Sequence, residues 1–406
     1  MLKLKAPPLL RHIRMPIVVL LLSNYITMTG MGFVVPFLPI YARELGASGF
    51  DLGILVAGFS LAMGLCQPFA GSLSDKYGRK KFLMTGLAIF SACGFAYTIS
   101  ESVIDITLVR FVQGFGAGMV FPVAMAYMAD WTPATYEGRY MGIFHISLMA
   151  GFGSGPVFGG ILNDAFGTQT AFLAMGISAF VSLVLILLFL PESQHGEENK
   201  KEVHSVFKVF FHILKQSRMR GVLIVRVAIM LAMVPSFIFL PVMMTENMGA
   251  SGTIIGVAIA IRVLITALLQ IPCGIIADRY NRVYITLISI FLVAITVSFY
   301  GFTETTWQLI GTFILLGICE AAFLPTTTAI AMESGESYGM GATMGVFNTA
   351  QTMGMFIGSI VGGLLIDMYG FGQAFLMLGC TVGFFSIVGA KVLLKTPTTL
   401  IQQKLS

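Results

Sequence analysis

The sequence predicts an all-α membrane protein of twelve transmembrane helices, arranged as two pseudo-symmetric six-helix bundles. Three observations support this prediction: a strongly apolar composition, twelve apolar runs of spanning length and an internal repeat. Hydrophobic residues make up 56% of the chain and charged residues 11%, whereas soluble domains carry roughly a quarter charged residues. A soluble fold of 406 residues has too little interior to hide so much apolar surface, so we expect an integral membrane protein.

The twelve runs are close to the length of about 20 apolar residues that a helix needs to cross a bilayer. In the N-terminal half we expect spans at residues 16–41, 52–73, 82–99, 104–128, 140–162 and 171–190. In the C-terminal half we expect them at residues 221–243, 253–277, 283–302, 306–332, 342–366 and 372–394. The chain is therefore expected to consist of a bundle at 1–190, a linker at 191–220 and a second bundle at 221–406.

A basic turn marks the internal repeat. The segment GSLSDKYGRKK at residues 71–81 returns in degraded form as GIIADRYNR at residues 274–282, an offset of 203 residues. The same offset aligns further pairs along the chain: Gly114 with Gly317, Pro122 with Pro325, Gly151 with Gly354, Asp164 with Asp367, and Gly167 with Gly370. Internal symmetry of this kind is typical of secondary transporters.

The basic residues predict the orientation, because cytoplasmic loops of membrane proteins carry an excess of lysine and arginine. With a cytoplasmic N-terminus, twenty of the 24 lysines and arginines fall in cytoplasmic segments, and only Arg43 lies in an outer loop. We therefore expect a multi-pass protein of the cell inner (plasma) membrane with both termini in the cytoplasm. The first apolar run is too long for a signal peptide and is expected to be retained. In the linker, VFKVFFHIL at residues 206–214 has the spacing of an amphipathic helix at the membrane surface.

No chemistry-bearing cluster is evident. The five cysteines lie singly in apolar runs without CxxC spacing, and the linker histidines are too unevenly spaced to share a helix face. The glycine-rich segments at residues 114–118 and 151–155 lack the lysine of a phosphate-binding loop and lie inside helices. We expect no metal, no cofactor, no nucleic-acid partner and no enzymatic activity.

Four segments of the N-terminal half resemble, in chain order, the signatures of one family. They are GFVVPFLP at residues 32–39, the basic turn at 71–81, RFVQG at 110–114 and GFGSGPVFGG at 151–160. These resemble the signatures of helix 1, the helix 2–3 turn, helix 4 and helix 5 of the major facilitator superfamily, in its twelve-helix drug:proton antiporter branch. The resemblance implies alternating access between two bundles around a central cavity lined by helices 1, 4, 7 and 10.

The basic turn is expected to form a conformational gate, because the resemblance implies that it latches the two halves on the cytoplasmic side in the outward-open state. Gly71 permits close helix approach, and Asp75 is placed to face the positive N-terminal end of the helix that starts near Ala342. The expected gate residues are Gly71, Asp75, Gly78, Arg79 and Asp130, with Asp278 and Arg282 in the second copy. A basic loop that only sets topology is the alternative.

Helix 5 carries small residues at four-residue spacing, which form a smooth face for close packing. The motif residues are Gly151, Gly155, Pro156, Gly159 and Gly160. The proline is expected to bend the helix. The resemblance associates this motif with antiporters, although helix packing alone explains the glycines equally well.

Four ionised side chains lie within predicted spans and away from their ends: Arg110, Arg226, Arg262 and Glu320. Each costs about 2.5 to 3.5 kcal/mol at a helix centre on insertion scales, so such groups tend to pair and to line cavities. Glu320 is expected near Arg226 or Arg262, where movement of the arginine would change its affinity for a proton. We assign proton coupling to Glu320, and the family resemblance implies that Arg110 modulates its protonation. A fixed buried pair and direct substrate binding are the alternatives.

Other polar side chains are candidates for the cavity wall, and most of them serve equally well as hydrogen-bond partners between helices. The cavity candidates are Asn24, Tyr25, Gln113, Tyr127, His145, Arg226, Arg262, Asn348 and Gln351. The 25 methionines and 34 phenylalanines suit an adaptable apolar cavity, although lipid-facing surfaces use the same residues.

Together these features predict a proton-coupled antiporter that exports small lipophilic compounds, as in multidrug efflux. We expect its partners to be a lipophilic small molecule, protons and the bilayer, and we expect it to act as a monomer. Three membrane arginines against one acid also suggest an exporter or flippase of anionic amphiphiles. A non-transporting membrane sensor with the same fold is the alternative from another class.

Overall fold

The apolar runs form helices, as predicted. The computed structural model describes residues 15–132, 136–193, 216–338 and 340–395, and every regular element in those ranges is a helix. Helices satisfy their own backbone hydrogen bonds, which is the condition for crossing hydrocarbon that offers no water. The expected amphipathic segment at residues 206–214 lies outside the described residues.

Seven helices make up the described N-terminal half. They are α1 (Met15–Val34), α2 (Phe37–Glu44), α3 (Gly49–Tyr77), α4 (Arg79–Thr98), α5 (Val103–Asp130), α6 (Glu137–Phe166) and α7 (Thr168–Phe189). The first predicted span is divided into α1 and α2, with Pro36 at the break. Proline lacks an N–H group and disfavours helical geometry in the residue before it, so the interruption is local to the sequence PFLP.

Five helices make up the described C-terminal half. They are α9 (Ser217–Met248), α10 (Gly252–Arg279), α11 (Arg282–Tyr300), α12 (Thr306–Tyr338) and α13 (Met340–Leu394). The element α13 contains two predicted spans that meet at Gly370, where φ is +75°. Its repeat counterpart Gly167 has φ +85° between α6 and α7. A left-handed glycine therefore makes the same turn in both halves, and the twelve predicted spans are all present.

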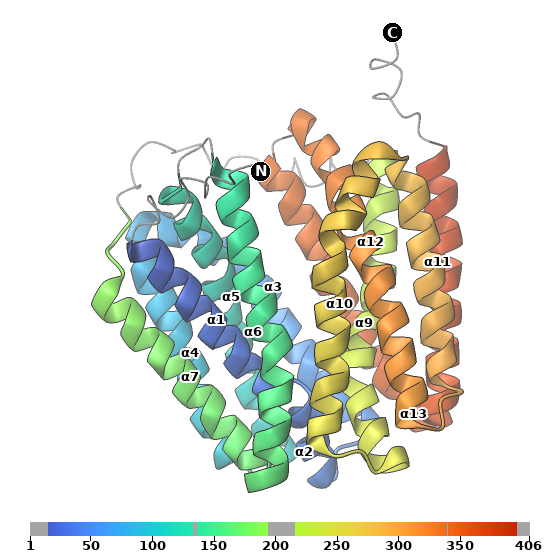
Figure 1. Ribbon diagram of the computed structural model, residues 1–406, viewed down its shortest axis with the longest axis horizontal. Coiled ribbons are helices and arrows are strands. Elements are labelled where there is room, and N and C mark those ends of the chain that lie inside the picture. The colour runs from blue at the N-terminus through green and yellow to red at the C-terminus, as the bar shows by residue number, and fades with distance from the viewer. Residues whose placement is uncertain (1–14, 133–135, 194–215, 339, 396–406) are drawn as a thin grey trace, which may run out of the picture.

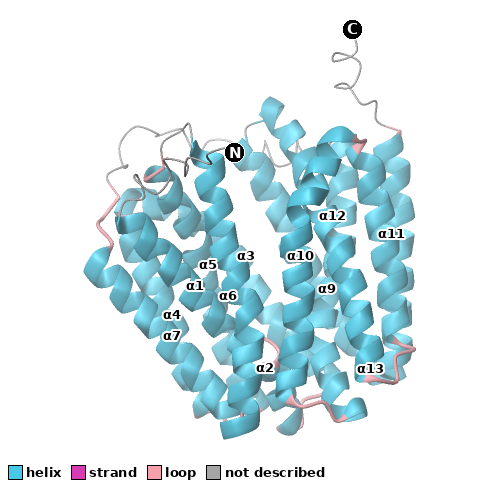
Figure 2. Cartoon of the chain, in the orientation of Figure 1, coloured by secondary structure: helices cyan, strands magenta, loops and turns pink. Residues whose placement is uncertain are grey.

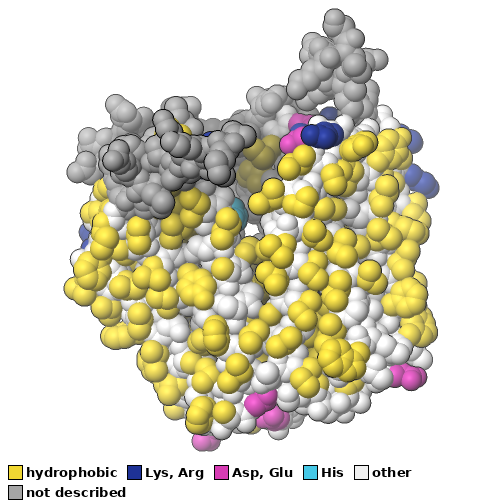
Figure 3. Space-filling model, viewed as in Figure 1, with side chains coloured by type: hydrophobic (Ala, Val, Ile, Leu, Met, Phe, Trp, Pro, Cys, Tyr) yellow, Lys and Arg dark blue, Asp and Glu magenta, His cyan; other side chains and the backbone are white. Residues whose placement is uncertain are grey.

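The two halves lie side by side and are joined unevenly along their length (Figure 1). We call the face where α1 begins and α13 ends the proximal face, and the face where α3 and α10 begin the distal face. The main contacts between the halves run along α3 with α13 and along α6 with α10, and α2 adds contacts with α9. Figure 2 shows the helices of the two halves converging toward the distal face, and the surface in Figure 3 is hollowed between the halves toward the proximal face.

The outer surface of the helices is apolar, as a bilayer requires. Large side chains such as Phe69, Phe166, Ile99 and Trp307 are more than half exposed. Hydrophobic side chains cover most of the face shown in Figure 3, and the acidic and basic side chains gather at its two ends. Eleven described helices are long and apolar enough to cross a membrane, and α13 supplies two crossings. The chain is a multi-pass membrane protein.

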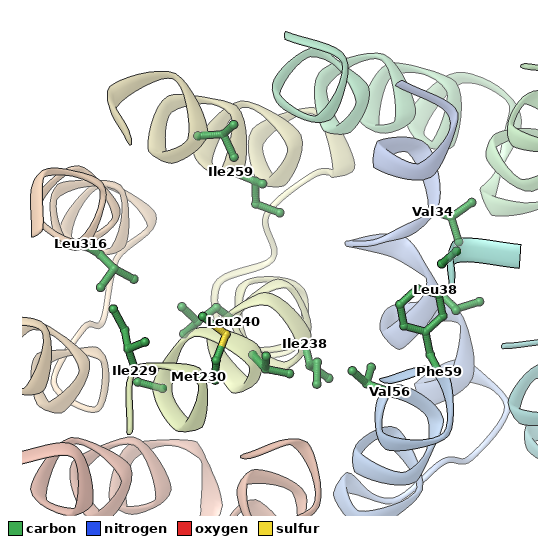
Figure 4. Packing of buried hydrophobic residues seen from close by; sticks show 14 of the residues in the cluster. Val34, Leu38, Val56, Phe59, Ile229, Met230, Ile238, Leu240, Ile259 and Leu316 are labelled. Carbon is green, nitrogen blue, oxygen red and sulfur yellow. The ribbon is translucent and has the colours of Figure 1, made fainter. Parts of the chain in front are cut away.

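Each half also has its own apolar interior. Figure 4 shows Leu38 and Phe59 close together in the N-terminal half, and Val56 of the same half pointing toward Ile238 on α9. Ile238 is 3% exposed and Phe59 is 4% exposed. The centre of the molecule between the halves is thus lined by apolar side chains at this level.

Two aspartates hold the distal face shut by capping helices of the opposite half. Asp367, on α13, accepts hydrogen bonds from the backbone N–H groups of Gly49 and Phe50 at the start of α3, both at 2.7 Å. Asp164, on α6, accepts from the N–H groups of Gly252 at 2.7 Å and Thr253 at 2.8 Å at the start of α10. A carboxylate at a helix N-terminus satisfies orphan donors and meets the positive end of the helix dipole.

The distal joint follows the internal repeat. Asp164 and Asp367 are repeat partners, and so are the two helix starts that they cap. A Cβ atom on Gly160 would lie 2.3 Å from the backbone oxygen of Gly252, and one on Gly363 would lie 2.2 Å from that of Gly49. Only glycine permits this approach of backbones across the interface.

One ion pair joins the halves beside the two caps. The Nε atom of Arg43 lies 2.9 Å from Oε1 of Glu246, and these residues are 203 positions apart. They are therefore repeat partners that meet each other. A side chain that contacts its own repeat partner must lie close to the pseudo-twofold axis between the halves.

We expect the double substitution Asp164→Asn and Asp367→Asn to open the distal face. Each change keeps the side-chain shape but removes a charge–helix interaction of about 1 kcal/mol, so together they shift the equilibrium between the two faces by about tenfold or more. The measurement is the distance distribution between spin labels at Glu101 and Glu304, two exposed distal positions, in a cysteine-free background.

The matched control is Asp105→Asn. This aspartate caps α5 through Ser102 in its own half, so its substitution should leave the distal distance unchanged. An equal widening in the control and in the double variant would show that the two caps are not what closes this face.

Candidate functional site

The only acid deep within a described span is paired with an arginine. Glu320 on α12 accepts from Arg262 on α10 in a two-point contact, in which Nη2 donates to Oε1 and Nε donates to Oε2 at 3.3 Å. The hydroxyl of Thr266 lies 3.4 Å from Oε2. Glu320 is 3% exposed and Arg262 is 1% exposed, so the pair is closed off inside the C-terminal half in this conformation.

Aromatic rings enclose the Arg262 guanidinium. It lies over the ring of Phe237, on α9, with 4.1 Å between the guanidinium carbon and the ring centroid, and 6.0 Å from that of Phe313, on α12. A ring face attracts a cation, and the attraction strengthens when water is absent. Arg262, on α10, is therefore held by side chains of α9 and α12, and its charge is compensated by Glu320.

Arg110 occupies a related place in the N-terminal half without an acid. Its Nη1 donates to Oε1 of Gln113 at 2.8 Å, and Tyr97 donates to the same oxygen at 2.9 Å. The guanidinium lies 4.5 Å from the centroid of Phe59. The arginine and the phenylalanine change places between the two halves. Phe59 is the repeat counterpart of Arg262, and Arg110 is the repeat counterpart of Phe313.

The acid has no counterpart in the N-terminal half. The repeat position of Glu320 is Ala117, which is fully buried on α5. The arrangement of cation and ring is thus symmetric between the halves, whereas the carboxyl group belongs to the C-terminal half alone among these described groups.

Arg226, on α9, is the least satisfied of the three membrane arginines. Its Nη2 donates to Oε1 of Gln351, on α13, and its guanidinium lies 4.5 Å from the ring centroid of Phe347. The Nε and Nη1 atoms are buried and make no hydrogen bond to a described residue. The expected meeting of Glu320 with an arginine thus takes place at Arg262 and not at Arg226.

Three cavity candidates are buried in the N-terminal half in this conformation. Gln113 is fully buried in the Arg110 network, and Tyr127 donates to the backbone oxygen of Pro191 at 2.8 Å. Asn24 is 6% exposed. Gln113 and Tyr127 therefore do not face an open cavity here, because they are hydrogen-bonded inside their own bundle.

The remaining candidates lie nearer the interface between the halves. His145 and Asn348 are repeat partners and both are exposed. Each lies eleven residues before a residue that meets the other half, namely Pro156 and Ser359, whose backbone oxygens approach Gly256 and Gly53. Eleven residues are about three helical turns, so each pair shares one helix face. The hydroxyl oxygen of Tyr25, by contrast, lies 3.4 Å from the hydroxyl oxygen of Ser154 within its own half.

The proximal basic turn forms ion pairs within the N-terminal half. Nε of Arg79 lies 2.6 Å from Oδ2 of Asp130, and Nη2 lies 3.0 Å from Asp75. A Cβ atom on Gly71 would meet nothing within 4 Å, so the close approach expected there is absent in this conformation, in which the proximal ends stand apart. Gly78 has φ +103°, which accounts for glycine at that position.

The second copy of the turn keeps the ion pairs with a different turn geometry. Nη1 of Arg282 lies 2.9 Å from Oε1 of Glu333, and its Nη2 lies 2.8 Å from Oδ1 of Asp278. Arg218 joins the same cluster, with its Nη2 atom 2.6 Å from Oε2 of Glu333. Asn281, which replaces the glycine, has φ −66° and caps α11 by accepting from the N–H of Val283. The departure from the first copy is thus a different helix start and leaves the charge cluster intact.

Asp75 is 57% exposed as a side chain and pairs with Arg79. The contact expected between Asp75 and the helix that starts near Ala342 involves residues whose side chains lie outside the described part. The role of the two charge clusters as a latch remains a prediction.

The helix 5 motif lies on α6 and packs on two partners. Gly151, Gly155 and Gly159 face α1, where added Cβ atoms would lie 2.5 to 2.7 Å from backbone atoms of Tyr25, Thr29 and Phe33. Gly160 faces α10 of the other half, and the oxygen of Pro156 approaches Gly256 there. The motif therefore fixes α6 against α1 and also lets the two halves meet.

Sequence analysis did not identify the distal caps, the Arg43–Glu246 pair or Glu192. Glu192 accepts from the N–H of Lys80 at 3.0 Å and caps the start of α4. The aspartates of the caps were visible as repeat partners, and each helix that they cap starts after a serine, Ser48 or Ser251. That repeat of acid and helix start was the available signal.

Comparison with known proteins identifies the family. The Major Facilitator Superfamily model matches residues 20–243 and 222–405, so the chain belongs to this superfamily of membrane transporters. An uncharacterized MFS-type transporter of Methanocaldococcus jannaschii is 28% identical over 354 residues, which cover 87% of this chain and 91% of that protein. The quinolone resistance protein NorA of Staphylococcus aureus (strain MSSA476) is 25% identical over 379 residues, covering 92% of this chain and 95% of NorA.

Solved structures agree on the fold. A bacterial homolog of the human lysosomal transporter Spinster, in an inward-facing and unoccupied conformation, has a TM-score of 0.79 at 12% identity over 93% of this chain and 97% of its own. A point mutant of the nucleoside transporter NupG has a TM-score of 0.79 at 15% identity, over 93% of this chain and 99% of its own.

Gly155→Ala should destabilise the protein. The new methyl group would lie 2.5 Å from the oxygen of Thr29 and 2.6 Å from the Cα of Gly32, and overpacking of this kind costs roughly 1 to 3 kcal/mol. Gly142→Ala is the matched control on the same helix, because nothing lies within 4 Å of its Cβ position. Thermal unfolding in detergent should show a lower Tm for the first variant only. Equal Tm values would mean that α1 can move away without cost.

The Arg262–Glu320 pair should be strongly coupled. Either Arg262→Met or Glu320→Met leaves one buried charge unpaired, at a cost of roughly 3 to 5 kcal/mol, whereas replacing both removes the charges together. We expect the double variant to be more stable than either single variant. Thermal unfolding of the three proteins measures this, and additive losses would show that the two side chains act independently.

Proposed function

We propose that this transporter is a proton-coupled antiporter that exports small lipophilic compounds by alternating access. The observation on which the proposal rests is Glu320, the one described acid deep within a span, which is held by a single arginine in a site closed to solvent. The similarity to NorA, a quinolone resistance protein, supports export of drug-like compounds.

In this proposal the proximal face is cytoplasmic and the protein lies in the plasma membrane. Twenty of the 24 lysines and arginines fall in the segments that the sequence assigns to that side, in agreement with the excess of basic residues in cytoplasmic loops. Because the distal face is closed by the two aspartate caps, the conformation is inward-facing. Substrate then enters from the cytoplasm or the inner leaflet, and the protein works as a monomer.

Proton coupling follows from the movement of one pair. The guanidinium of Arg262 stabilises the ionised form of Glu320, and a state in which the two groups separate favours the protonated form because burial disfavours a lone charge. A rearrangement between α10 and α12 that opens the pair to one side therefore takes up a proton there. Arg110 contributes a fixed positive charge in the other half.

The proximal charge clusters form the gate of this cycle. Arg79 with Asp75 and Asp130, and Arg282 with Asp278 and Glu333, lie at corresponding places in the two halves. In the outward-open state the proximal ends approach each other, and Gly71 then supplies the close contact that is absent in the inward-facing conformation. The distal caps separate in the same movement.

Anionic amphiphiles are the second candidate cargo. Arg110 and Arg226 have no carboxylate within ion-pair distance among the described residues, whereas Glu320 already serves Arg262. The membrane interior of the described chain thus carries uncompensated positive charge, which favours an acidic cargo over a cationic one.

Proton flux in proteoliposomes tests the proposal. We expect a panel of lipophilic cations, neutral compounds and acids to include at least one that triggers proton movement in the wild type, and Glu320→Gln to lose this response almost entirely because the proton site is gone. Glu101→Gln, at an exposed distal position, is the control and should retain it.

Transport of an acid without proton movement in the wild type would reject proton coupling and favour the second candidate. A protein that moves no compound under any gradient would instead support a membrane sensor built on this fold.

A further inference from the structure

Among the three membrane arginines, Arg226 alone combines incomplete pairing with a position on the open side. It lies nine residues after the proximal start of α9 at Ser217, which is about 13 Å along the helix. Arg110 lies seven residues after the distal start of α5 at Val103, on the side that the aspartate caps close. A ligand entering between the separated proximal ends therefore reaches the level of Arg226 first.

Arg226 lies on a face of α9 that also contacts the N-terminal half, while its guanidinium is held by Gln351 and Phe347 of α13. Phe237 lies eleven residues later, about three helical turns, and so shares its helix face. The ring of Phe237 meets that of Phe152 on α6 of the other half, with centroids 6.1 Å apart. Arg226 thus lies on the same side of α9, nearer the proximal face, where the two halves have moved apart (Figure 1).

The surroundings of Arg226 position the cation without neutralising it. Gln351 accepts one hydrogen bond and Phe347 covers one face of the guanidinium, and both groups are uncharged. The Nε and Nη1 donors are buried without a described acceptor. A charge left in this condition is costly, which makes a purely structural role a poor explanation for an arginine here.

We propose that Arg226 is an anion-binding subsite, which takes the acidic group of an amphiphilic substrate, a carboxylate or a phosphate ester. Guanidinium groups favour these anions because their N–H donors form short, charge-assisted hydrogen bonds with oxyanions. The apolar body of the substrate lies along the same face of α9 toward Phe237 and Phe152. This inference rests on the proposed transport function and specifies the charge of its cargo.

Binding of four naphthalene compounds to the purified protein in nanodiscs tests the subsite. The probes are 1-naphthaleneacetate, 1-naphthyl phosphate, 2-(1-naphthyl)ethanol and 2-(1-naphthyl)ethylamine, which share a ring system and differ in head group. We expect the wild type to bind at least one acid more tightly than the alcohol. The two acids separate carboxylate recognition from phosphate recognition.

Two variants remove the subsite in different ways. Arg226→Met removes the cation, and Gln351→Glu keeps it but supplies a carboxylate from the chain, as Glu320 does for Arg262. Both should weaken acid binding by about tenfold or more and leave the affinity for the alcohol within about twofold. Arg279→Gln is the control, because it removes the same charge from an exposed position at the proximal end of α10.

The alcohol affinity and the Tm of each variant report whether the fold is intact. Acid binding that survives Arg226→Met, a parallel loss of alcohol binding, or a wild type that binds neither acid better than the alcohol overturns the proposal. The proton-flux measurement tests antiport independently of this binding assay. If acid binding depends on Arg226 but no compound moves protons, the subsite stands and proton antiport is rejected.

Discussion

The constraint on which this structure depends is that hydrocarbon offers no hydrogen-bonding partner to a polar group. It makes every described crossing a helix, and it leaves few ionised side chains between the two faces. Those that remain are held by specific groups: Arg262 by Glu320, and Arg110 and Arg226 each by one glutamine and one phenylalanine ring. The other described ion pairs lie at the two faces, where water and helix ends can satisfy them.

The internal repeat gives the distal joint its form. Because α3 and α10 are repeat partners, and so are Asp164 and Asp367, one contact between an acid and a helix start occurs twice across the interface. Two equivalent caps lie on either side of a pseudo-twofold axis, beside the close backbone packing of α3 on α13 and of α6 on α10. The caps are modest in energy, since each is a charge meeting a helix dipole. Weak, paired contacts suit a face that must open during transport.

The departures from symmetry point to function. Glu320 has an alanine as its repeat partner, and the arginine–phenylalanine pairs of the two halves are exchanged between helices. Proton chemistry can therefore reside in one half, while both halves contribute cation. The uncompensated donors of Arg226 lie on the open side of the molecule and the compensated pair lies in the closed interior of the C-terminal half. In the proposed function, charge recognition and proton exchange therefore lie in different parts of the same protein.

The sequence by itself determined the twelve spans and the repeat, because apolar length and a constant offset can both be read along the chain. It also indicated that Glu320 needs an arginine, although it left Arg226 and Arg262 equally eligible. Only the tertiary structure decided between them, and only it placed Gln113 and Tyr127 inside a bundle and the aspartates on helix starts of the opposite half. The physical reason is that an all-apolar helix carries no periodicity to fix its rotation, so which side chains face one another depends on how the helices pack.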